Sequence, residues 1–125
     1  MKCNVNPFMG IEPKIVVIHA IDDDGVVFPL IERLCKMGLR IWHDEEIRGK
    51  MIDYSFNWKS QQSKCNCFLI YLSRNAINSH VFRERFTNAV ESSKPFVVIS
   101  TIENEDLSPG MMLQIKSFLL QVMLL

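Results

Sequence analysis

Three consecutive aspartates follow a short apolar run near the start of the chain. The run covers residues 14–20 (KIVVIHA), and Asp22, Asp23, Asp24 and Gly25 come after it. Carboxylate oxygens are the ligands that hard cations prefer, so these residues could hold a divalent metal ion. Adjacent residues in one turn seldom point at one centre, however. We therefore interpret them as a solvated loop that caps the next helix, and we expect no metal site.

The histidines and cysteines do not supply a metal site either. His19, His43 and His80 lie at expected strand or loop ends, and no HxH or HExxH spacing connects them. Cys65 and Cys67 stand two residues apart at the start of an expected strand, and the chain has no CxxC pair. We interpret the thiols as reduced and structural, which favours a cytoplasmic location.

The loop after the first apolar run also lacks the glycines of a phosphate-binding loop. A dinucleotide site of the Rossmann type needs GxGxxG and a P-loop needs GxxxxGK[ST], whereas the chain has IDDDG. Three carboxylates there would also repel the phosphate of FMN. A response-regulator receiver needs a phosphate-accepting aspartate at the end of its third strand, where this chain has Ser73 and Arg74. The sequence argues against all four classes.

Composition indicates one globular domain. The 125 residues are 48% hydrophobic and 22% charged, near the values of ordinary globular proteins. The 14 basic residues balance the 14 acidic ones, so no overall positive field would attract nucleic acid or an anionic membrane. The apolar-rich segment 111–125 is interrupted by polar residues and is not expected to span a membrane. We expect partners of neither kind.

Apolar runs and helical stripes alternate along the chain. Because each run is apolar throughout, the pattern is typical of a parallel sheet covered on both faces. We predict a flavodoxin-like, doubly wound α/β fold with four or five strands in the order 2-1-3-4-5 and helices on both faces. Residues 1–13 are expected to form an N-terminal extension and 14–125 the domain. Strands are predicted over 14–20, 39–43, 67–72 and 96–99, with a fifth at 121–125, and helices over 26–37, 51–64, 81–92 and from about 111.

Four segments in this order and spacing resemble the Toll/interleukin receptor (TIR) domain, nearest to its small bacterial-type members. They are IVVIHAIDDD, GLRIWHDEE, FLIYLSRNAINS and ERFTNAVESSKPFVVIS, and together they cover about residues 14–100. The resemblance implies the flavodoxin-like fold and two kinds of activity. Some family members associate with other TIR domains through the loop after the second strand, and others cleave NAD⁺ between nicotinamide and ribose.

The chain departs from the pattern of the NAD⁺-cleaving members. Their helix after the third strand carries a Trp and, four residues later, a Glu, where this chain has Val81 and Arg85. Cleavage builds positive charge on the ribose, which a carboxylate stabilises and an arginine does not. Glu84 is the nearest catalytic candidate, although one residue on a helix is a rotation of about 100°. The candidate residues of a degenerate nucleotide pocket are His19, Asp24, Trp42, Asp44, Ser73 and Arg85.

The loop after the second strand is the expected partner contact. It reads EEIRGKM, with a basic tip on an otherwise acidic loop. The contact candidates are Glu45, Glu46, Arg48, Gly49 and Lys50, and an ordinary solvated turn is the alternative.

Three functions therefore remain open. The first is a TIR-type signalling domain that acts by self-association, as a homo-oligomer, or by pairing with another TIR domain, with a degenerate NAD⁺ site and no required cofactor. The second is an NAD⁺ glycohydrolase that uses Glu84 or another carboxylate such as Asp44. The third is a flavodoxin-like small-molecule binder.

Overall fold

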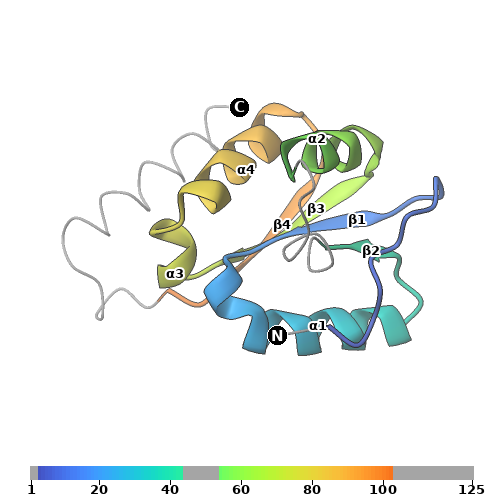
Figure 1. Cartoon of the computed structure of the whole chain (residues 1–125), viewed down its shortest axis with the longest axis horizontal. Helices are drawn as coiled ribbons and strands as arrows, with labels where there is room; N and C mark the ends of the chain where they lie inside the picture. The colour runs from blue at the N-terminus through green and yellow to red at the C-terminus, as the bar shows by residue number, and fades with distance from the viewer. Residues whose placement is uncertain (1–2, 44–53, 103–125) are drawn as a thin grey trace.

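A computed structural model shows a central parallel sheet with helices on both faces (Figure 1). It describes residues 3–43 and 54–102, with the side chains of the second range described from residue 58. In this part of the chain the strands are β1 (Ile15–Ile18), β2 (Ile41–Trp42), β3 (Cys67–Leu72) and β4 (Phe96–Ser100). Their order, β2-β1-β3-β4, confirms the predicted fold class. The expected last helix and fifth strand lie outside the described residues.

The strand register brings the carboxyl ends of β1 and β3 to the same edge of the sheet. Ile15 is paired with Cys67, and Ile18 with Ile70. Side chains alternate between the two faces, as strand geometry requires, so that Val16 and Phe68 belong to one core cluster and Val17 belongs to the other. Continuous apolar runs are therefore needed, because both faces of these strands are buried.

Helices cover the two faces unequally. α1 (Asp24–Lys36) lies on one face, while α2 (Tyr54–Lys64) and α4 (His80–Glu91) lie on the other (Figure 1). The larger core cluster gathers residues of α2, α4, β1 and β3, among them Trp58, Phe82 and Phe86. The smaller cluster packs Phe28 and Ile31 of α1 against the sheet.

Two short helices join the strands to the long ones. η1 (Ile21–Asp23) precedes α1, and α3 (Arg74–Ile77) precedes α4. Ser73 starts α3, because its hydroxyl accepts a hydrogen bond from the backbone N–H of Ala76 at 3.0 Å.

The start of the chain packs against the domain. Cys3 is fully buried and belongs to the smaller core cluster. The backbone N–H of Phe8 donates to the carbonyl of Ile41 at 2.9 Å, at the outer edge of β2. Residues 3–8, part of the segment that we expected as an extension, therefore contribute to the core and cover a strand edge.

Candidate functional site

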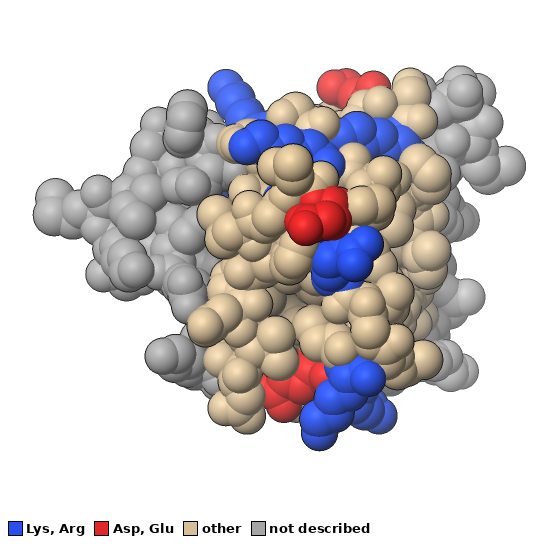
Figure 2. Space-filling view, turned by 90° about the vertical axis from the view of Figure 1, so that its right-hand side faces the viewer, with Lys and Arg blue, Asp and Glu red and all other residues tan. Residues whose placement is uncertain are grey.

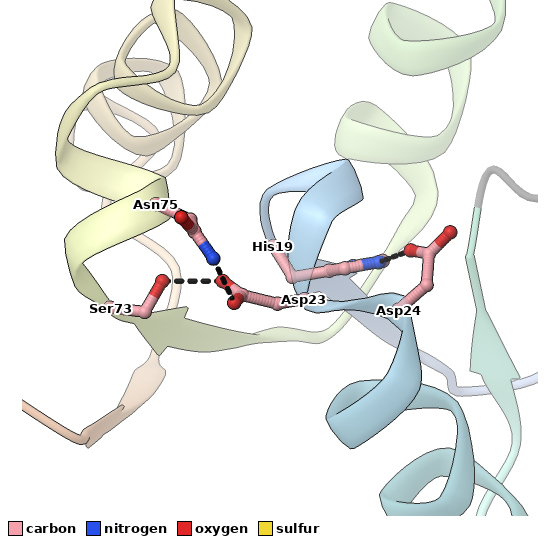
Figure 3. Close-up of polar contacts among 5 residues, drawn as sticks. All are labelled: His19, Asp23, Asp24, Ser73 and Asn75. Atoms are coloured by element: carbon pink, nitrogen blue, oxygen red, sulfur yellow. Dashed lines mark hydrogen bonds and ion pairs between the residues drawn. The ribbon is translucent and has the colours of Figure 1, made fainter.

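Polar side chains from separate parts of the chain meet at the carboxyl ends of β1 and β3 (Figure 3). Asp23, on η1, accepts hydrogen bonds from the Ser73 hydroxyl and from the Asn75 side-chain amide, the latter at 2.8 Å. Ser73 also caps α3, so its oxygen serves both contacts. One carboxylate thus fixes the loop after β1 to the junction between β3 and α3.

The prediction of a solvated, helix-capping loop is wrong for two of the three aspartates. Asp22 is exposed, as predicted. Asp23 and Asp24 are only 8% and 6% exposed, and the side chain of Asp23 makes no capping bond to α1. Burying a carboxylate is costly unless hydrogen bonds compensate. For Asp23 the donors come from Ser73 and Asn75, about fifty residues further along the chain, so a local pattern could not reveal them.

A second buried pair lies beside the first. The Nε2 atom of His19, at the end of β1, lies 2.8 Å from Oδ1 of Asp24, at the start of α1. The imidazole ring also packs edge-on against Phe28, with centroids 5.8 Å apart. A histidine oriented by a carboxylate is an arrangement that can move a proton, and the pair also ties β1 to α1.

A pocket of about 410 Å³ opens next to these pairs, a volume suited to a small ligand. One wall comes from the end of β1 and from η1, and the other from α3 and the start of α4. Ile21 and Val81, on opposite walls, are 63% and 56% exposed, so each wall presents an apolar side chain to solvent. The lining consists of His19, Ala20, Ile21, Asp22, Asn75, Asn78, Ser79, Val81 and Arg85.

The structure brings four of the predicted pocket residues to this region. His19 and Arg85 line the pocket, and Asp24 and Ser73 are buried in the polar pairs beside it. Trp42 is fully buried in the larger core cluster and does not belong to the lining. Asp44 and the partner-loop candidates, residues 45, 46 and 48–50, lie outside the described residues.

The two candidates on α4 differ in their relation to the pocket. Arg85 lines it, and its guanidinium lies 5.0 Å from the centroid of the Trp58 ring, which is cation–π geometry. Glu84 is exposed and does not belong to the lining. The position that faces the pocket therefore carries a cation.

The sequence did not single out Asn75 or Asn78, although both line the pocket. Their one signal is position, because they follow a strand whose carboxyl end meets the loop after β1. Among the described residues, no group of three or more His, Cys, Asp or Glu side chains could hold a metal ion. No helix in the same part of the chain is both long and apolar enough to cross a membrane.

Comparison with known proteins identifies the fold. The TIR domain of the Toll-related receptor TRR-2 from Hydra magnipapillata superimposes with a TM-score of 0.61, over 78% of this chain and 77% of that one. The chain has the fold of a TIR domain. The two sequences are 13% identical, no family model matches the chain, and a search of curated proteins gives no match. The likeness to a TIR domain is thus one of fold.

Proposed function

We propose that this chain is a TIR-type interaction domain that acts by self-association or by pairing with another TIR domain, and that its pocket does not cleave NAD⁺. The observation that carries the proposal is the place of Arg85. It lies on the pocket wall formed by α4, where the resemblance puts the carboxylate of NAD⁺-cleaving members. The TIR fold and the exposed apolar side chains at the pocket support contact with a protein partner.

The charge of Arg85 opposes cleavage for a physical reason. Breaking the bond between nicotinamide and ribose leaves positive charge on the sugar, which a nearby guanidinium destabilises. Loss of one positioned acid or base already costs a factor of roughly 10² to 10⁴ in rate. Glu84, one residue away, is not part of the lining and could not replace it without rotation of the helix.

The first test is incubation of the concentrated protein with NAD⁺, with nicotinamide release followed by NMR. We expect no release above the rate without protein. Arg85→Glu places a carboxylate at the pocket, and it is the variant in which nicotinamide release would be gained. Glu84→Gln is its matched control. Release by the unaltered protein would contradict the proposal, and its loss in Glu84→Gln would assign the cleavage to Glu84.

The second test concerns association and the loop after β2. Light scattering over a range of concentrations should show oligomers, and Arg48→Glu with Lys50→Glu should reduce them. Arg33→Glu with Lys36→Glu makes the same charge change on the exposed surface of α1 and serves as the control. A strictly monomeric protein would contradict self-association, and pairing with a second TIR domain would then be the form to test.

One observation favours the alternative NAD⁺ glycohydrolase. Asp22 and His19 both line the pocket, on the wall opposite Arg85, and supply a carboxylate and an imidazole. If the unaltered protein released nicotinamide, Asp22→Asn would separate this arrangement from one that uses Glu84.

A cytoplasmic location is part of the proposal. None of the four cysteines is in a disulfide. Reduced thiols are the usual state in the cytosol, which supports this location.

A further inference from the structure

The first described residues form an arm that lies along the edge of the domain. We define the N-terminal arm as residues 3–8, and Figure 1 shows the start of the chain passing α1 and β2 before it turns back into β1. Cys3 enters the smaller core cluster, and Val5 packs against it. The arm therefore occupies a surface made by α1 and the outer edge of β2.

Hydrogen bonds fix the arm along its length. The backbone N–H of Asn4 donates to the Glu32 carboxylate at 3.0 Å, and the N–H of Phe8 donates to the carbonyl of Ile41 at 2.9 Å. Nε2 of the buried His43 lies 2.8 Å from the carbonyl of Val5 and must donate to it, because a carbonyl only accepts. These contacts define a site that this particular segment fits.

The connection between the arm and β1 is exposed and sharply bent. Met9 and Ile11 are 64% and 91% exposed. Gly10 allows the bend, because a Cβ atom there would lie 2.6 Å from Cζ of Phe8 and would also collide with the carboxylate of Glu12. The arm thus returns to its own domain through a turn that tolerates no side chain without adjustment.

We propose that the N-terminal arm exchanges between two copies of this chain, so that residues 3–8 of each copy fill the α1 and β2 surface of the other. The contacts of the arm are the same in both arrangements, so exchange costs little beyond the entropy of association. The six residues that connect the arm to β1, 9–14, span at most about 20 Å when extended, so the two domains must lie close together.

The exposed apolar residues of the connection indicate that the partner is a second copy of the chain. In a two-fold exchanged dimer the two connections run past each other near the symmetry axis. Met9 and Ile11 of both copies would meet there, which removes from water apolar surface that the single copy leaves exposed. This inference does not rest on the proposed TIR association, because it is argued from the N-terminal arm and its connection and not from the loop after β2.

The first experiment changes the bend. Gly10→Ala places a methyl group against Phe8 when the arm folds back on its own domain, but not when the connection is extended toward a second copy. The dimer fraction measured by light scattering should therefore rise several-fold after refolding at high concentration. Gly25→Ala is the matched control, since nothing lies within 4 Å of a Cβ there. Equal dimer fractions in the two variants would overturn the proposal.

The second experiment asks directly whether the arm crosses between copies. A copy with Asn4→Cys is refolded together with a differently tagged copy with Glu32→Cys, and a short bis-maleimide is added. We expect a covalent heterodimer, and a much weaker one when Arg33→Cys, the exposed neighbour, replaces Glu32→Cys. Dimers by light scattering without this cross-link would show association through another surface, which overturns exchange and leaves the proposed TIR association standing.

Discussion

Asp23 connects two segments that the strands alone bring near each other. Its carboxylate accepts from Ser73 and Asn75, and the Ser73 oxygen accepts from the backbone of Ala76. Buried charge-assisted hydrogen bonds are stronger than neutral ones, but leaving one partner unsatisfied is costly. The position of Asn75 on the pocket wall therefore depends on a buried residue of η1.

We expect Asp23→Asn to lower the free energy of unfolding by about 1–3 kcal/mol. An amide has one oxygen, so it can replace only one of the two carboxylate oxygens that accept these hydrogen bonds. The neighbouring Asp22→Asn is the control and should change it by less than about 0.5 kcal/mol, since Asp22 is exposed. Urea denaturation midpoints check the difference. Equal midpoints for the two variants would mean that the carboxylate of Asp23 contributes nothing as an anchor.

The thiol of Cys67 gives a second prediction for single residues. Burial raises the pKa of this thiol above its ordinary value of 9.0. The folded state therefore holds the proton more tightly than the unfolded state, and the stability that this group contributes is present below pH 9.0 and is lost as the pH rises through the folded-state pKa.

The stability difference between the unaltered protein and Cys67→Ala should accordingly stay constant up to about pH 9 and shrink above it. Comparing the two proteins at each pH cancels the titrating groups that do not interact with Cys67, including Lys14, whose pKa burial lowers. Urea midpoints at neutral pH and at several values above 9.0 provide the measurement. A difference that grows with pH would contradict the sign.

At the scale of elements, the side chain of Lys94 caps the C-terminal end of α2, although Lys94 is not part of that helix. Its ammonium donates to the carbonyls of Gln62, Ser63 and Cys65 at 2.6, 2.9 and 2.9 Å. The last carbonyls of a helix have no partners within it and carry partial negative charge, so a cation there satisfies both needs. Lys94, two positions before β4, thereby fixes the helix that precedes β3.

Lys94→Met should lower the free energy of unfolding by about 1–3 kcal/mol, because three carbonyls lose their donor. It should also speed hydrogen exchange at the end of α2, where the N–H of Cys65 bonds to Gln61. Lys59→Met, an exposed lysine on the same helix, should change neither. If both variants behaved alike, the effect would come from general charge rather than from these bonds.

The sequence allowed prediction of the elements better than of the site. Apolar runs marked β1 and β3, because parallel strands buried on both faces need continuous apolar residues. A run of the same kind marked β4, although its Val97 and Val98 are exposed. The sequence did not predict the polar cluster, because the burial of Asp23 depends on Ser73 and Asn75, which only the parallel register brings close. Cys3 was likewise missed, since a segment before the first strand gives no periodic signal that would place it in the core.

At the scale of the whole molecule, one sheet joins two unequal cores. The larger cluster holds both tryptophans, Trp42 and Trp58, while the smaller one contains Phe28 and is completed by Cys3 of the N-terminal arm. β1 and β3 contribute side chains to both clusters. Because the same strands line both clusters, a loss of packing in one cluster also loosens the packing of the other.

Phe28→Ala tests this coupling, because it removes a fully buried ring from the cluster that holds no tryptophan. We expect a loss of about 3–5 kcal/mol. The urea transition should move to lower concentration equally by far-UV circular dichroism and by tryptophan fluorescence, as a two-state domain requires. Met37→Ala, an exposed residue after the same helix, should leave both transitions in place. A circular dichroism transition that moves while the fluorescence transition stays would mean that α1 and the arm unfold apart from the larger core.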